Sequence, residues 1–124
     1  MMRRVVVCIL ALAVLVPVQS PAVGATKKPV AVGIAEREHY ISPYRRSVPV
    51  GLVKLNIRNF GEDVHNLVIR GPRGFHLVGP DVDPGTGKAW VVRFRRAGTY
   101  KLLCTRANHL ALGMKSKLRV KKRR

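Results

Sequence analysis

The stretch that decides the fold is Ala97 to Met114, Ala-Gly-Thr-Tyr-Lys-Leu-Leu-Cys-Thr-Arg-Ala-Asn-His-Leu-Ala-Leu-Gly-Met. Tyr100, Leu102 and Cys104 are spaced by two residues, which places their side chains on one face of a β-strand. After Met114 the same alternation returns, and it continues to Val120. The stretch therefore predicts two neighbouring strands joined by a short loop that begins at Cys104 and ends at Met114.

The two-residue period also occurs upstream. It runs through Val53 to Ile57 and through Trp90 to Phe94, and Gly- and Pro-rich turns such as Asp83-Pro84-Gly85 separate the runs. The segment Val30 to Ile41 can add one or two further strands, and no segment after residue 25 has a sustained helical period with caps. We expect an all-β, antiparallel sandwich of about seven to eight strands.

The first 25 residues resemble a secretory signal. A basic start, Met1-Met2-Arg3-Arg4, precedes an apolar run from Val5 to Val16, and small residues follow at Val23-Gly24-Ala25. The run is shorter than the roughly 20 residues of a membrane span, although an uncleaved anchor is the alternative. We expect a signal peptide at 1–25, a basic linker and first strand at 26–47, a sandwich core at 48–120 and a basic tail at 121–124. We expect an exported protein, periplasmic or extracellular, for which association with the cell surface is one alternative, with no transmembrane span in the mature chain.

The charge is strongly positive. The formal net charge is +18, and it falls to +16 when Arg3 and Arg4 are removed with the signal. Such a field attracts anionic partners, which include acidic proteins and anionic surfaces. Export and the absence of a stacking pattern among the aromatic residues argue against nucleic acid.

Cleavage of the signal leaves Cys104 as the only cysteine and Met114 as the only methionine. A lone thiol in an exported protein cannot form an internal disulfide, so it is an intermolecular partner, a reactive group or a metal ligand. His109 lies between the two residues in the pattern Cys-x4-His-x4-Met. His65, at the start of an upstream strand, is the candidate for a fourth donor. Two imidazoles, a thiolate and a weak thioether favour one copper ion and electron transfer.

These residues resemble the cupredoxin (plastocyanin and azurin-like) family of type 1 blue copper proteins. Val64-His65-Asn66-Leu67-Val68 is similar to the family's first-ligand strand, and Gly98-Thr99-Tyr100 is similar to its turn into the ligand cysteine. The resemblance implies a Greek-key sandwich with His65, Cys104, His109 and Met114 as copper ligands. It also implies that Asn66 ties the His65 segment to the ligand loop.

By the same resemblance, the edge of His109 is exposed in an apolar patch through which electrons leave. Leu110 and Leu112 fit that patch, and an acidic redox partner is expected to dock there. His39 and His76 are not part of a ligand-like sequence pattern, and we expect them to be ordinary surface residues.

Three functions remain open. The first is a one-electron carrier that transforms no substrate and is therefore not an enzyme. The second is a copper-binding protein for delivery or tolerance without rapid electron transfer. The third is a basic wall-binding sandwich with a vestigial copper motif.

Overall fold

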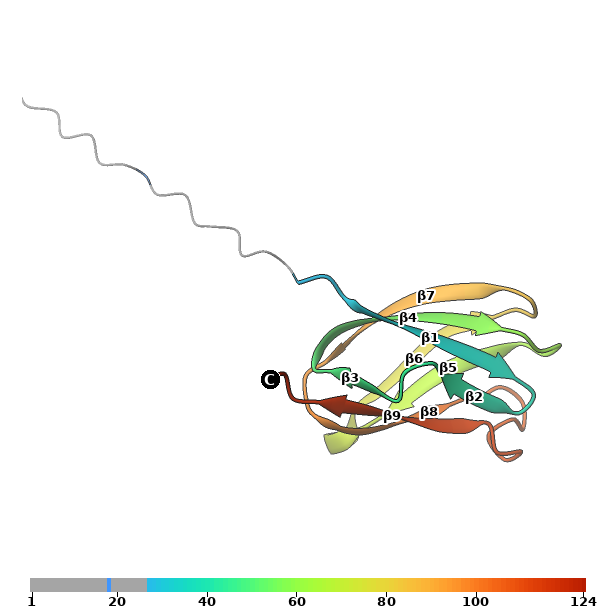
Figure 1. Ribbon diagram of the computed structural model, residues 1–124. Helices are drawn as coiled ribbons and strands as arrows, with labels where there is room; N and C mark the ends of the chain where they lie inside the picture. Colours follow the sequence, from blue (N-terminus) through green and yellow to red (C-terminus); the bar gives the residue numbers. More distant parts are fainter. Residues whose placement is uncertain (1–17, 19–26) are drawn as a thin grey trace, which may run out of the picture.

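The computed structural model describes Val18 and residues 27–124 (Figure 1). The predicted signal lies outside the described residues, apart from Val18. Nine strands make up the described chain: β1 (Val30–Arg37), β2 (Tyr40–Pro43), β3 (Ser47–Pro49), β4 (Gly51–Asn59), β5 (His65–Arg70), β6 (His76–Val82), β7 (Gly87–Phe94), β8 (Gly98–Leu103) and β9 (Lys115–Lys121). A single 3-10 turn, η1 (Pro72–Gly74), joins β5 to β6.

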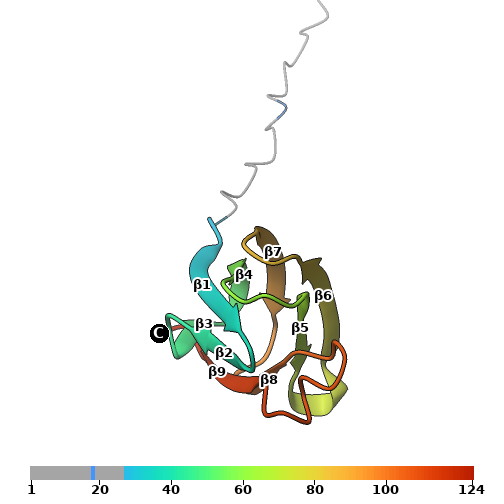
Figure 2. The ribbon, with the colours of Figure 1, turned by 90° about the vertical axis from the view of Figure 1, so that its right-hand side faces the viewer.

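The strands form two sheets that face each other as a sandwich (Figure 2). One sheet has the order β2-β1-β4-β7, and the other has the order β3-β9-β8-β5-β6. The all-β sandwich predicted from the sequence is confirmed. Both sheets are mixed, however, because β1 runs parallel to β4 and β3 runs parallel to β9. An alternating pattern reveals a buried face but not the direction of a neighbouring strand, so the pattern alone could not show these two pairs.

The core lies between the sheets and follows the alternation read from the sequence. Val53, Leu55 and Ile57 of β4 are buried, while the residues between them are exposed. At the end of the core where β8 begins, Phe75, Phe94 and Tyr100 form an aromatic cluster with ring centroids 4.8 to 5.9 Å apart. The aromatic cluster fills the sandwich at that end, and the opposite end carries the predicted ligands.

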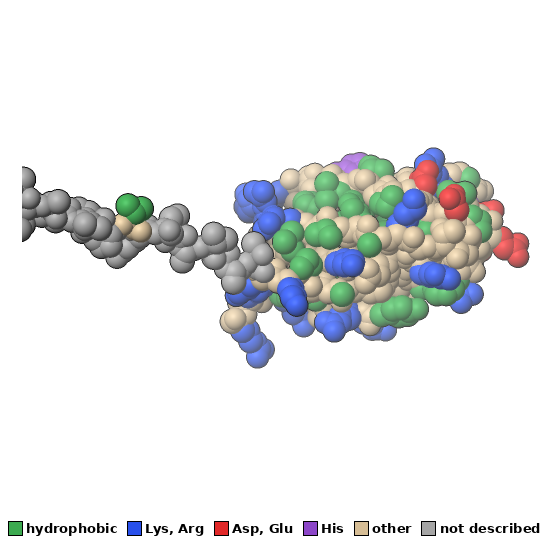
Figure 3. Space-filling view, turned by 90° about the horizontal axis from the view of Figure 1, so that it is seen from above, with side chains coloured by type: hydrophobic (Ala, Val, Ile, Leu, Met, Phe, Trp, Pro, Cys, Tyr) green, Lys and Arg blue, Asp and Glu red, His purple; other side chains and the backbone are tan. Residues whose placement is uncertain are grey.

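Acidic side chains are confined to the end of the sandwich that holds the predicted ligands. Apart from the buried Glu36, they are Glu38 in the β1–β2 connection, Glu62 and Asp63 in the β4–β5 connection, Asp81 near the end of strand β6 and Asp83 in the β6–β7 connection. Figure 3 shows the acidic groups of one face gathered at that end, with lysine and arginine spread over the rest. The high net positive charge therefore hides a pronounced asymmetry.

Glu36 is a buried carboxyl in β1. It is fully shielded from solvent, and neither of its oxygens has a hydrogen-bond partner. Burial raises its pKa from the ordinary 4.5 to about 7, because a charge is costly in an apolar interior.

In the part of the chain that the structure describes, no helix has the length and apolar character needed to cross a bilayer.

The raised pKa of Glu36 predicts a loss of stability as the pH rises. The folded protein holds the proton up to about pH 7, whereas the unfolded chain releases it near 4.5, so the stabilising contribution present at low pH disappears between these values. As the pH rises across this interval, we expect the free energy of unfolding of the metal-free Glu36→Gln variant to increase by about 3 kcal/mol relative to that of the wild type. Urea unfolding at several pH values measures the difference, and a constant difference would contradict the prediction.

Candidate metal centre

Strand pairing brings the predicted ligands to one end of the sandwich. His65 is the first residue of β5, and Cys104 directly follows β8. These strands are antiparallel neighbours, with Val68 opposite Leu103, so the start of β5 lies beside the end of β8. His109 and Met114 lie in the loop that connects β8 to β9. Residues that are 39 positions apart in the chain therefore meet at one place.

Three ligand atoms converge in the buried space between these segments. The Nδ1 atoms of His65 and His109 are 3.1 Å apart, and Cys104 Sγ lies 3.8 Å and 3.5 Å from them, respectively. All three atoms lie within 4.8 Å of one another, and the three side chains are 0 to 4% exposed. Two nitrogens and one sulfur thus face a common point that is closed to solvent.

Met114 is fully buried beside this group and is tied to it through the main chain. Its N–H donates to the carbonyl of His109 at 3.0 Å, and its carbonyl accepts from the N–H of Cys104 at 3.1 Å. The preceding Gly113 has a φ of +95°, a conformation that glycine adopts without strain. These features fold the loop back, so that Met114 follows His109 closely and starts the return into β9.

Asn66 joins the two halves of the site. Its side-chain oxygen accepts from the N–H of Thr105 at 2.9 Å, and its amide nitrogen donates to the Thr105 hydroxyl at 3.1 Å. Because Asn66 follows His65 and Thr105 follows Cys104, the pair fixes the spacing between two of the converging side chains. The contact is the one that the family resemblance implied.

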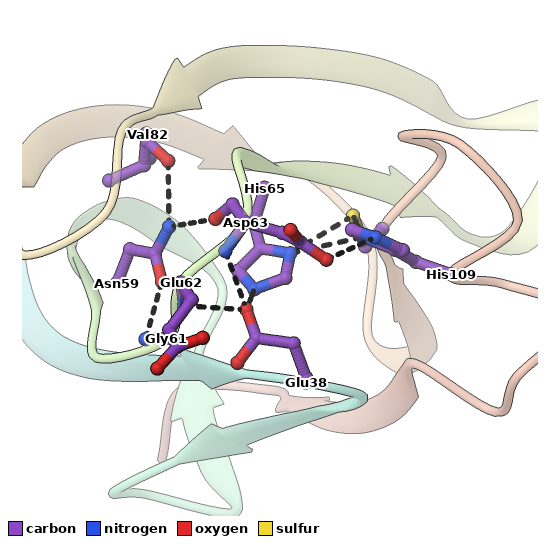
Figure 4. Close-up of polar contacts among 9 residues, drawn as sticks. Glu38, Asn59, Gly61, Glu62, Asp63, His65, Val82 and His109 are labelled. Carbon is purple, nitrogen blue, oxygen red and sulfur yellow. Dashed lines mark hydrogen bonds and ion pairs between the residues drawn. The ribbon is translucent and has the colours of Figure 1, made fainter.

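The outer nitrogen of each histidine faces a carboxylate (Figure 4). His65 Nε2 lies 3.0 Å from Glu38 Oε1, and His109 Nε2 lies 3.3 Å from Asp63 Oδ2. A carboxylate can only accept, so each Nε2 is the donor in these contacts, and each Nδ1 faces the interior. Sequence reasoning missed both carboxylates, because Glu38 and Asp63 belong to turns without a ligand-like spacing.

Burial sets the protonation of the metal-free site. It lowers the pKa of His65, an effect that neighbouring Glu38 partly offsets, and it raises the pKa of the Cys104 thiol. Hydrogen bonds from the backbone N–H groups of Asp63 and Glu62 help to lower the pKa of Glu38 to about 2, so this group stays ionised. Without metal the interior therefore holds a neutral His65 imidazole and a neutral Cys104 thiol, and a bound cation would replace the thiol proton.

His39 differs from its predicted role as an ordinary surface residue. It is half-buried, and its ring centroid lies 5.2 Å from that of His109. The edge of His109 is also less open than the resemblance implied, since only 4% of the residue is exposed. Two segments account for these differences. The β1–β2 turn brings His39 to the same end of the sandwich, and the carboxylate of Asp63 lies against the outer nitrogen of His109. His76 is exposed at the start of β6, as expected.

The donor set fits a soft or borderline metal. Imidazole nitrogen together with thiolate and thioether sulfur suits copper in both of its common oxidation states, whereas structural zinc usually takes four cysteine or histidine ligands. His39, Asp63 and His109 form a second group of possible ligand atoms within 4.8 Å of one another. That group shares His109 with the buried site and lies on its outer side.

No protein-family model matches the chain, and no curated protein sequence does. Solved structures do match. Dithionite-reduced auracyanin from Roseiflexus castenholzii aligns with a TM-score of 0.62 and 22% identity, over 74% of this chain and 97% of that one. Auracyanin A from Chloroflexus aurantiacus, described as a "blue" copper protein, aligns at 0.59 and 19%, over 76% and 100%. A purple cupredoxin from Nitrosopumilus maritimus aligns at 0.51 and 18%, over 72% and 98%.

This chain has the cupredoxin fold. The two mixed sheets and the convergence of ligand atoms at one end of the cupredoxin sandwich agree with the resemblance read from the His65 strand and the Cys104 loop. The identities are low, so these matches show the fold alone. The function of this protein is therefore argued from its own residues.

The hydrogen bonds of Asn66 predict a measurable contribution to stability. Asn66→Ala removes both contacts with Thr105 and leaves the Thr105 N–H without its acceptor, whereas Thr105→Ala removes only the hydroxyl contact. We expect a loss of about 2 kcal/mol for the first variant and about 1 kcal/mol for the second in the metal-free protein. Urea unfolding measures both losses. Equal and negligible losses would show that the contact does not hold the two segments together.

Proposed function

We propose that this protein is an exported one-electron carrier that binds one type 1 copper ion through His65, Cys104, His109 and Met114. The observation that carries the proposal is the convergence of two imidazole Nδ1 atoms and one cysteine sulfur in a buried space. This set is typical of blue-copper sites, in which a thioether such as that of Met114 is the weak axial ligand. One of the proteins that it resembles in fold is described as a "blue" copper protein, which supports the assignment.

The protein's own contribution is to hold the ligands in place before the metal arrives. Bound copper would supply a centre that alternates between Cu(II) and Cu(I). Asn66 and the main-chain bonds of Met114 keep the ligand segments together, and the buried position of all four side chains excludes water. A site that need not rearrange, and that water does not enter, favours rapid electron transfer. No group in this arrangement acts on a substrate, so we propose a carrier and not an enzyme.

Electrons would pass through His109 to a partner that docks at the same end. Leu112 is half exposed, and Leu110 lines a hollow together with Leu103, Lys101 and Lys115. The apolar patch of Leu110 and Leu112 therefore has cations of β8 and β9 on one side. Asp63 lies on the other side, beside His109. An acidic redox partner fits the lysine side of this patch, and the net positive charge would steer it from a distance.

Copper delivery or tolerance is the alternative function. A delivery protein passes its metal to another set of ligands, so its site has to be accessible. Here His65, Cys104 and Met114 have no measurable exposure. The closed site favours the carrier.

A Cu(II) titration of the purified chain tests the proposal directly. A thiolate–copper bond gives an intense visible absorption band and a narrow copper hyperfine splitting, so we expect both in the wild type. Cys104→Ser is expected to abolish them, because the sulfur donor is lost. Met114→Leu is expected to keep the band and raise the reduction potential, because the axial donor is lost. The proposal fails if reduced, folded wild type binds Cu(II) without the visible band.

Rates with a small redox probe test the docking side. We expect the double variant Lys101→Glu and Lys115→Glu to slow oxidation of the copper(I) protein by hexacyanoferrate(III) several-fold at low salt, because the local potential changes sign. The control is Lys54→Glu with Arg93→Glu, which makes the same charge change on exposed positions of the other sheet. Stopped-flow spectroscopy measures both rates. Equal slowing in the two variants would show that only the net charge matters.

A further inference from the structure

We infer that Glu38 is the positioning residue of His65: its carboxylate fixes which ring nitrogen faces the metal and strengthens that nitrogen as a donor. The inference deepens the copper function proposed above and rests on it. Glu38 lies outside the set of residues that the sequence pattern offered as ligands or as their neighbours. It touches no metal-facing atom and acts only through the ring of His65.

One carboxylate oxygen makes three contacts at once. Glu38 Oε1 lies 3.0 Å from His65 Nε2, and it accepts from the main-chain N–H groups of Glu62 and Asp63 at 2.9 Å each (Figure 4). The ring of His65 is completely buried, so no water competes for its outer nitrogen. Two of the contacts hold the carboxylate in place, and the third transmits that position to the ring.

The β4–β5 loop, which supplies the two N–H groups, is itself held in place by the side chain of Asn59. Asn59, buried at the end of β4, donates to the carbonyls of Asp63 and Val82 at 2.7 and 2.9 Å, and its oxygen accepts from the N–H of Gly61 at 2.8 Å. Both hydrogens and the acceptor of this side chain are used. The β4–β5 loop therefore presents its N–H groups to Glu38 from a defined direction, and the position of the carboxylate is determined by three segments of the chain.

Gly61 leaves the space that the carboxylate occupies. A Cβ atom built on Gly61 would overlap with both carboxylate oxygens and the carboxyl carbon of Glu38. Any side chain at this position has to displace the carboxylate. Gly61 thus offers a way to move Glu38 away from His65 without changing Glu38 itself.

The carboxylate has an electronic effect as well as a steric one. A negative acceptor on the Nε2 hydrogen makes the ring a stronger donor at Nδ1, as carboxylate–histidine–metal arrangements do elsewhere. A stronger donor favours Cu(II) over Cu(I). Asp63, by contrast, is 58% exposed and lies 3.3 Å from His109 Nε2, so water screens its effect. The carboxylate on His65 is therefore the less exposed of the two, at 29% for Glu38 against 58% for Asp63.

The test compares variants that separate charge from shape. Glu38→Gln keeps an oxygen that can accept the two loop N–H groups and the histidine hydrogen, but it removes the charge. Glu62→Gln removes one charge from an exposed residue of the β4–β5 loop and serves as the matched control. Gly61→Ala displaces the carboxylate while the charge is retained.

The first measurement needs no copper. Nitrogen-15 NMR of the imidazoles in the metal-free protein reports which nitrogen of His65 carries the hydrogen. We expect a single form protonated at Nε2 in the wild type and in Glu62→Gln, and a mixture of the two forms in Gly61→Ala. A pure Nε2-protonated form in Gly61→Ala would overturn the positioning role, whether or not the protein proves to be a copper carrier.

The second measurement uses the copper-loaded protein. We expect Glu38→Gln to retain the visible band and to shift the ratio of Cu(II) to Cu(I) affinities about tenfold towards Cu(I), which is about 59 mV for a one-electron couple. Glu62→Gln is expected to shift it far less. An unchanged ratio in Glu38→Gln, together with lowered stability, would show that Glu38 only clamps the loop. If the wild type showed no visible band, the carrier proposal would fail while the NMR result would still decide the role of Glu38.

Discussion

The dominant constraint in this molecule is the crowding of two imidazole nitrogens and one sulfur in a space that water does not enter. Each atom presents a lone pair to the same point, so none can satisfy another fully unless a cation or a proton lies between them. Burial keeps His65 and Cys104 neutral without metal. Such a centre persists only if the surrounding chain holds it, and the hydrogen bonds at this end of the sandwich serve that purpose.

The holding contacts come from segments that are remote from one another. Asn66 links the first-ligand strand to the ligand loop, and the main chain of Met114 closes the loop between Cys104 and His109. The β1–β2 turn adds Glu38 from the opposite sheet. Because β1 lies parallel to β4, the end of β1 reaches the same edge as the β4–β5 loop, and the carboxylate meets the N–H groups that hold it.

The distribution of charge gives the two sides of this end different characters. Carboxylates on the turns face the outer nitrogens of the histidines, where they complement the ring N–H groups. Lysines on β8 and β9 lie beside the apolar residues of the loop on the other side. A protein of high net positive charge can thus keep carboxylates close to its site and still present a basic surface beside it.

The sequence by itself determined the all-β sandwich and the placing of Cys104 and His109 in one loop, because side-chain alternation and ligand spacing are local properties of the chain. His65 was a candidate because it starts an upstream strand and because its segment resembles a family, and strand pairing then brought it to the loop. It also pointed to the link made by Asn66, through resemblance to a family. The parallel strand pairs, the carboxylates on both outer nitrogens and the place of His39 beside His109 were decided only by the tertiary structure. Glu38, Asp63 and His39 lie in turns where no period or spacing marks them. Their roles depend on which turns the sheets bring to one end, and that is a property of strand order and direction across the whole sandwich.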